Sequence, residues 1–140
     1  MNGKCFVDTN VLIYAHDTLS GPKHHQARAL TEEIWSAGNG VLSTQVLQEF
    51  CATVRRKPQR PLSLEDVHTI LREYLLWEVV VNTPTSVLDA LHLESRFKIS
   101  FWDALILTAA EHASASILYS EDFSNGQRYG AIRVVNPFLG

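Results

Sequence analysis

Residues 5–15 read CFVDTNVLIYA, and this stretch indicates the fold more strongly than any other part of the chain. Cys5-Phe6-Val7 is a short apolar run that stops at Asp8, a pattern typical of a buried strand. Val11 to Ala15 then predicts a helical turn directly after that strand. A strand that leads into a helix is the first half of a βαβ unit. The stretch therefore predicts an α/β protein in which a carboxylate marks the end of the first strand.

The rest of the chain continues the alternation of strands and helices. Four more strands are expected, at Val41–Ser43, Val79–Val81, Ile117–Tyr119 and Ile132–Val135. Helices are expected at His25–Ala37, at Thr44–Lys57, after Ser63, from Thr83-Pro84 and at Phe101–Ala113, with Ser63, Thr83 and Ser100 as caps. This order predicts one domain over residues 1–140, a three-layer α/β/α fold whose central parallel sheet has about five short strands.

Apolar periodicity predicts which helix faces are buried. The helix after Ser63 carries a stripe of Leu64, Val67, Ile70, Leu71, Tyr74 and Leu75. In the next helix, Val87, Leu88 and Leu91 are expected to face inward. The helix Phe101–Ala113 is apolar on nearly every side, which is typical of a central, covered helix. His24 and His25, at a helix start, are expected to face solvent.

Composition sets limits on the class of protein. A hydrophobic fraction of 46% and a charged fraction of 19% suit a globular domain, and a net charge of −3 argues against binding nucleic acid by bulk electrostatics alone. Cys5 and Cys51 are expected as buried free thiols rather than a disulfide. We find no signal peptide and no apolar stretch of membrane-spanning length, so a cytoplasmic location is expected, with no membrane contact.

Four acids fall where a site is expected. Asp8 and Asp122 follow the first and fourth predicted strands, Glu49 flanks the apolar face of its helix, and Asp103 is the polar exception in an apolar helix. In open parallel sheets, sites form beyond the carboxyl ends of the strands. Carboxylates gathered there repel one another unless a cation joins them, and an all-oxygen donor set suits Mg²⁺ or Mn²⁺. The set predicts metal-assisted phosphodiester hydrolysis.

Taken singly, each of these acids has a structural alternative. Asp8 suits an Asx-turn with Thr9 and Asn10, and Asp103 suits a capping acid favoured by the helix dipole. Glu49 suits a solvated helix position and Asp122 a turn. Only their joint placement favours the metal site.

Five motifs in order resemble those of PIN-domain ribonucleases, especially VapC-type toxins of prokaryotic toxin–antitoxin pairs. The matching segments are Phe6–Ala15, Leu47–Phe50, Phe101–Ile106, Leu118–Phe123 and Asn136–Phe138, so the resemblance covers essentially the whole chain. It implies a Mg²⁺- or Mn²⁺-dependent ribonuclease that cleaves single-stranded or looped RNA and leaves a 5′-phosphate and a 3′-hydroxyl. It also implies a cognate antitoxin and a homodimer.

The resemblance assigns roles to particular residues. Asp8 and Asp103 correspond to direct metal ligands, Glu49 to an acid that binds metal directly or through water, and Asp122 to one that completes the site or holds a second ion. Three polar neighbours correspond to residues that orient the acids or the attacking water: Thr9, Asn10 and Ser120. Glu121 adjoins Asp122, and the motif favours Asp122 as the site acid.

The densest basic cluster comprises Arg55, Arg56, Lys57 and Arg60. It suits a rim that contacts RNA phosphates, and it equally suits a solvated helix end favoured by the dipole.

Three other functions are alternatives to a toxin ribonuclease. A phosphohydrolase with an aspartyl-phosphate intermediate is disfavoured, because Asn10 stands where a second acid is needed and no lysine follows Lys98. A PIN-type RNA-processing nuclease without a toxin role, and a metal-tuned RNA- or protein-binding module without turnover, both remain open.

Overall fold

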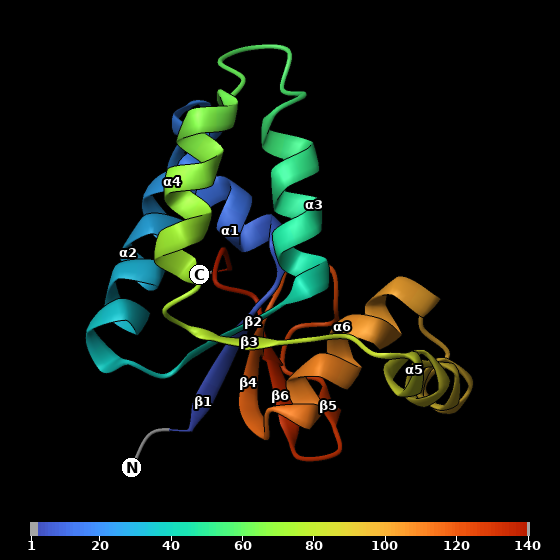
Figure 1. The fold of residues 1–140 in the computed structure, drawn as a ribbon. Coiled ribbons are helices and arrows are strands. Elements are labelled where there is room, and N and C mark those ends of the chain that lie inside the picture. The colour runs from blue at the N-terminus through green and yellow to red at the C-terminus, as the bar shows by residue number, and fades with distance from the viewer. Residues whose placement is uncertain (1–2, 140) are drawn as a thin grey trace.

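The computed structural model describes residues 3–139, and its strands and helices alternate as predicted (Figure 1). The elements are β1 (Lys4–Val7), α1 (Thr9–His16), a 3-10 turn (Thr18–Ser20), α2 (Pro22–Ala37), β2 (Gly40–Ser43), α3 (Thr44–Val54), α4 (Leu64–Tyr74), β3 (Glu78–Val80), α5 (Pro84–Phe97), α6 (Phe101–His112), β4 (Ala115–Tyr119), β5 (Arg128–Tyr129) and β6 (Ile132–Val135). The expected turn after β1 is thus a full helix, α2 begins at Pro22 rather than His25, and α3 ends at Val54 rather than Lys57.

The sheet is six-stranded, in the order β3-β2-β1-β4-β6-β5. All neighbouring pairs are parallel except β5 and β6, which are antiparallel. About five strands were expected, and the additional one is the two-residue β5, which is too short to leave an apolar pattern in the sequence. The mostly parallel α/β prediction is confirmed.

The core lies between the sheet and its helices. Figure 1 shows α6 against one side of the strands with α5 outside it, while α1 and α2 lie toward the other side. In the three central strands Phe6, Val41 and Leu118 lie side by side in register, and none of them has any exposed area. Full burial of side chains of this size contributes about 1.5–3 kcal/mol each. α3 and α4 form an antiparallel pair that projects from the sheet (Figure 1).

Three predicted helix caps are confirmed. The Ser63, Thr83 and Ser100 hydroxyls each accept a hydrogen bond from the backbone N–H three residues on. The cap on α6 matters for the site, because α6 runs directly into β4. Its first turn therefore lies at the edge of the sheet where the parallel strands end.

The prediction that Val87, Leu88 and Leu91 face inward was wrong. These three side chains are 44%, 60% and 51% exposed. α5 instead buries a face of Ser86, Ala90 and Leu93 and packs on α6. The buried face combines two small residues, Ser86 and Ala90, which suit close packing against α6, with the larger Leu93.

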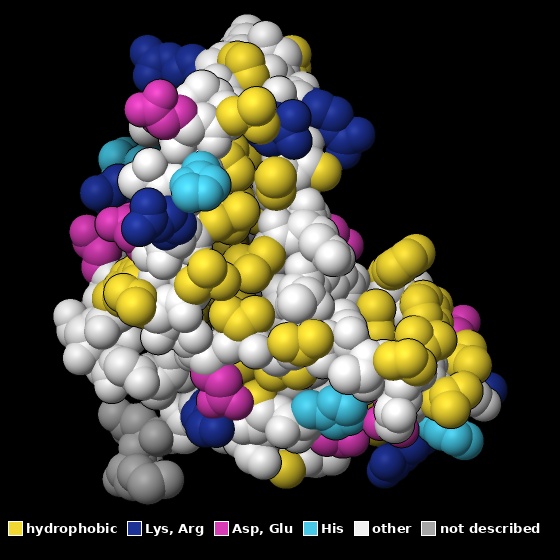
Figure 2. All heavy atoms as spheres, viewed as in Figure 1, with side chains coloured by type: hydrophobic (Ala, Val, Ile, Leu, Met, Phe, Trp, Pro, Cys, Tyr) yellow, Lys and Arg dark blue, Asp and Glu magenta, His cyan; other side chains and the backbone are white. Residues whose placement is uncertain are grey.

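Two further expectations about burial were wrong. In α4, Leu64 and Leu75 at the ends of the stripe are exposed, whereas Val67 and Tyr74 are buried. His24 is buried rather than solvent-facing, with its Nδ1 2.9 Å from the carbonyl oxygen of Tyr14. Figure 2 shows hydrophobic side chains exposed over α5 and along the α3–α4 pair.

Both thiols are free as predicted, Cys5 buried and Cys51 half-buried. Of the helices formed by residues 3–139, none has the length and apolar character needed to cross a membrane.

Candidate active site

The candidate site lies where the order of strands reverses. From β1 the chain runs outward through β2 to β3, and it then returns to place β4 on the other side of β1. The carboxyl ends of β1 and β4 flank this switch point, the preferred position for ligands in open α/β sheets. Asp8 follows β1, and Ser120 and Asp122 follow β4. The Ser120 hydroxyl donates to Asp8 Oδ2 at 2.7 Å and so joins the two turns.

The carboxylate of Asp8 is the most enclosed of the four acids, with a residue exposure of 4%. Its Oδ1 accepts a hydrogen bond from the Thr9 N–H at 2.7 Å, so Asp8 also caps α1. Burial raises the pKa of Asp8 to about 7, and the negative charges of Asp122 and Glu49 add to the rise. The hydrogen bonds from Ser120 and Thr9 oppose it. Asp8 therefore has a structural role, as the cap of α1, as well as its position at the site.

The polar neighbours predicted to orient the acids each donate to one of them. Thr9 Oγ1 donates to Glu49 Oε1 at 2.6 Å, across from α1 to α3. Asn10 Nδ2 donates to Asp122 Oδ2 at 2.8 Å, and Ser120 Oγ accepts from the Asp122 N–H at 3.0 Å. Three elements far apart in the sequence are thereby tied together at the acids.

Asp103 joins the same electrostatic neighbourhood from α6. It is half-buried in the first turn, where its N–H donates to Ser100 Oγ at 3.1 Å. Burial raises the pKa of Asp103, and the charges of Asp122 and Glu49 raise it further. The pKa of Asp122 is raised by burial and then by Glu121 and Glu49. The charges of Glu49 and Asp122 thus act on both Asp8 and Asp103, which is unfavourable without a cation.

The donor set fits a hard dication held with water. Within residues 3–139, no group of three or more Asp, Glu, His or Cys side chains is arranged so that it could hold a metal ion on its own. Mg²⁺ commonly uses one or two carboxylates, keeps several waters and takes other oxygens from substrate phosphates. Two amide oxygens at the site, Asn10 Oδ1 and Gln45 Oε1, are buried and have no hydrogen-bond partner among the described residues. Oxygen is therefore the donor type that this region offers.

A family model identifies the domain. The model described as PIN domain matches residues 5–125. The chain belongs to the PIN-domain family. The match spans β1 through the turn that follows β4, so it includes all four acids.

Solved structures share the fold of this PIN domain. A toxin–antitoxin complex from Klebsiella pneumoniae is 18% identical, with 96% of this chain and 98% of that chain covered and a TM-score of 0.68. VapC20 of Mycobacterium tuberculosis, a toxin that cleaves the sarcin–ricin loop, is 17% identical over 85% and 90%, with a TM-score of 0.64. DNA-bound VapBC from Salmonella typhimurium is 16% identical over 96% and 97%, with a TM-score of 0.64. No curated protein sequence matches significantly.

Gln45 is a site residue that the sequence did not reveal. It is only 5% exposed, and its Nε2 donates to Glu49 Oε2 at 3.3 Å and to the Trp102 carbonyl at 3.4 Å. It therefore joins α3 to the first turn of α6, beside Asp103. The available signal was its position one helical turn before Glu49, where side chains of a helix meet.

Two residues of the basic cluster contact other side chains, and the other two form no ion pair with the described part of the chain. Lys57 Nζ pairs with Asp17 Oδ2 at 3.3 Å, and Arg60 Nη1 donates to Thr18 Oγ1 at 3.3 Å. These two side chains fasten the loop after α3 to the end of α1. Arg55 and Arg56 are exposed and form no ion pair with any described residue.

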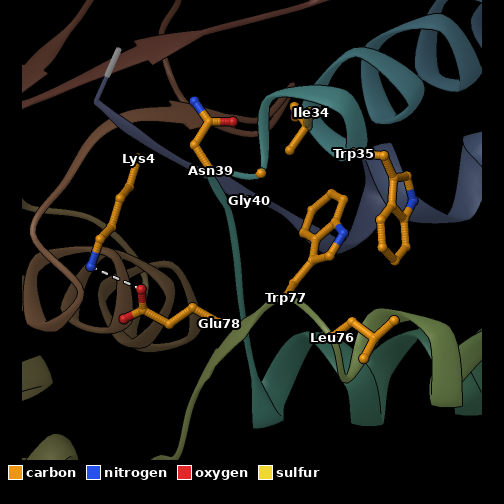
Figure 3. Close-up of a pocket in the computed structure, with 9 residues that line it drawn as sticks. Lys4, Ile34, Trp35, Asn39, Gly40, Leu76, Trp77 and Glu78 are labelled. Atoms are coloured by element: carbon orange, nitrogen blue, oxygen red, sulfur yellow. Dashed lines mark ion pairs between the residues drawn. The ribbon is translucent and has the colours of Figure 1, made fainter. Parts of the chain in front are cut away.

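A separate hollow of about 290 Å³ lies at the opposite edge of the sheet (Figure 3). Trp35 and Trp77 form one wall with ring centroids 5.4 Å apart, and Lys4 and Glu78 form an ion pair of 2.8 Å at another. Lys4 begins β1 whereas Asp8 follows its end, so this hollow contains none of the four acids. It is distinct from the candidate active site.

Proposed function

We propose that this PIN domain is a divalent-metal-dependent endoribonuclease. Asp8 and Asp103 would hold Mg²⁺ or Mn²⁺, and Glu49 and Asp122 would contribute directly or through water. The observation that carries the proposal is the buried Asp8 carboxylate at the switch point, joined to the Asp122 turn by Ser120 and lying within reach of the charges of Asp122 and Glu49. Family membership and the all-oxygen donor set support it.

The proposed chemistry is hydrolysis of a phosphodiester. When bound, a divalent ion supplies charge neutralisation at the phosphate and favours deprotonation of the attacking water. The water oxygen forms a bond to phosphorus, the P–O3′ bond breaks, and a proton passes to the leaving 3′ oxygen. The products carry a 5′-phosphate and a 3′-hydroxyl.

The residues of the chain prepare the site for that reaction. Thr9, Asn10 and Ser120 each bind one carboxylate oxygen and hold the acids in fixed orientations without conformational cost at the moment of reaction. Arg55 and Arg56, free of acidic partners in the described chain, are proposed to contact RNA phosphates.

We further propose that the enzyme is the toxin of a toxin–antitoxin pair, with an antitoxin protein as partner and a homodimer as its assembly. The support is the shared fold with VapC20 and with the toxin–antitoxin complexes from Klebsiella and Salmonella. Exposed apolar side chains on α4 and α5 offer surface for such protein contacts (Figure 2).

Cleavage of a structured RNA with single-stranded loops, with Mg²⁺ or Mn²⁺ and with chelator, tests the activity. We expect cleavage by the native protein and its loss in Asp8→Ala and Asp103→Ala, while the exposed-acid control Asp66→Asn keeps it. Equal cleavage by all variants would remove this site from the reaction. RNA retention without cleavage in any metal would favour a binding module. Growth arrest on expression, relieved by the neighbouring gene, separates a toxin from an RNA-processing enzyme.

A further inference from the structure

The turn that carries Asp122 contains a second acid whose side chain is fully engaged elsewhere. Tyr14 Oη donates to Glu121 Oε1 at 2.6 Å, and Lys23 Nζ donates to Glu121 Oε2 at 2.7 Å. Tyr14 lies on α1 and Lys23 on α2. Both carboxylate oxygens of Glu121 are therefore directed at helices on one side of the sheet.

Aromatic rings reinforce this contact. The Lys23 ammonium lies 5.0 Å from the centroid of the Tyr14 ring and 5.4 Å from that of Phe138, and the two rings meet edge to face at 5.1 Å. The side chains of Lys23 and Glu121 are 43% and 21% exposed. The ion pair is thus partly shielded from water, and screening by solvent and salt weakens it less than a surface pair.

Three consecutive residues of the turn are fastened to three different points. Ser120 donates to Asp8, Glu121 accepts from Tyr14 and Lys23, and Asp122 accepts from Asn10. With the middle residue held to α1 and α2, the backbone of the turn has little freedom left. Without that anchor, the exposed Asp122 would be held by the bond from Asn10 to its side chain and by the bond from its own N–H to Ser120 Oγ.

We infer that Glu121 is a positioning residue, held by Tyr14 and Lys23 in a clamp that fixes the orientation of Asp122 at the metal centre. This inference rests on the proposed function. Lys23 pairs with Glu121 and so offsets part of the negative charge that Glu121 adds beside Asp122. Glu121 is not itself a ligand in this arrangement, because both of its oxygens are occupied.

Metal affinity and RNA cleavage test the clamp together. Calorimetry measures Mn²⁺ affinity, and RNA cleavage gives kcat/KM. Thermal unfolding in chelator shows whether each variant is folded. In Glu121→Ala we expect both Mn²⁺ affinity and kcat/KM to fall about tenfold, the usual cost of losing support for a metal ligand. Glu121→Gln, whose amide oxygen still accepts one hydrogen bond, should recover part of each loss. The control Glu111→Ala, at an exposed position of α6, should match the native protein.

A double variant separates positioning from general destabilisation. If Glu121 acts through Asp122, then Glu121→Ala adds no further loss of Mn²⁺ affinity to Asp122→Asn. Additive losses, or native affinity and kcat/KM in Glu121→Ala, would overturn the inference. If Glu121→Ala does not fold, Tyr14→Phe is the variant to test, because it keeps the ring and removes only the hydroxyl. Native Mn²⁺ affinity and native kcat/KM in Tyr14→Phe would then overturn the inference. Failure of the native protein to cleave RNA would refute the proposed function. The Mn²⁺ affinities of the variants would still test whether Glu121 positions Asp122.

Discussion

Replacing Asp8 by Asn should stabilise the metal-free protein at neutral and higher pH. Burial, together with the nearby acids, raises the pKa of Asp8 from its ordinary value of 3.8 to about 7. Between these values the folded protein keeps a proton that the unfolded chain has released. Stability of the native protein without metal therefore falls as pH rises from about 4 to about 7 and is level above that. Asp103 and Asp122, whose pKa values are also raised chiefly by burial, act in the same direction.

The size of the effect follows from the two pKa values. Their difference corresponds to a destabilisation of about 4 kcal/mol at pH 8 from Asp8 alone. Asn has nearly the same shape, keeps the bond from the Thr9 N–H and places an N–H near Ser120 Oγ, but carries no charge. If half of the cost is recovered, the variant gains about 2 kcal/mol, or roughly 7 °C in Tm for a domain of this size.

Thermal and urea unfolding in chelator from pH 4 to pH 8 measures this gain. The advantage of Asp8→Asn should grow with pH and nearly vanish at pH 4, whereas the exposed-acid control Asp66→Asn should follow the native curve. Saturating Mg²⁺ should raise the Tm of the native protein and leave that of Asp8→Asn unchanged. If the variant were equally or less stable than the native protein at pH 8, the argument that Asp8 is a buried, electrostatically strained carboxylate would be wrong.

Three further predictions concern other parts of the chain. Gln45→Leu removes the donor that joins Glu49 to α6, so kcat/KM on RNA should fall about tenfold with little change in Tm, and native kinetics would contradict its role. Leu88→Lys, at a 60% exposed position of α5, should change the free energy of unfolding by no more than about 0.5 kcal/mol. Ala90→Leu, at a fully buried position, should lower it by about 1–3 kcal/mol. A larger loss for Leu88→Lys than for Ala90→Leu would mean that α5 presents the opposite face to α6. Ser100→Ala should cost about 1 kcal/mol through loss of the α6 cap, as measured by urea unfolding, and an unchanged midpoint would argue against the cap.

Much of the fold was determined by local sequence patterns. The apolar run before Asp8 indicates β1, and the caps at Ser63, Thr83 and Ser100 mark their helices correctly, because a strand pattern or a cap involves residues close together in the chain. Strand ends also predicted which acids lie at one edge of the sheet. That inference needs only the rule that parallel strands end together.

Contacts between distant segments decided the rest. Asp8 meets Ser120 and Asn10 meets Asp122 across 112 positions each, and the pairing of Glu121 with Tyr14 spans 107. Periodicity gave the wrong inner face for α5, because close approach to α6 favours Ala90 over the larger Leu88, a preference that exists only once both helices are in place. The types of residue at the site could be predicted from the sequence, but the orientation of each side chain depends on partners that only the folded chain brings within hydrogen-bonding distance.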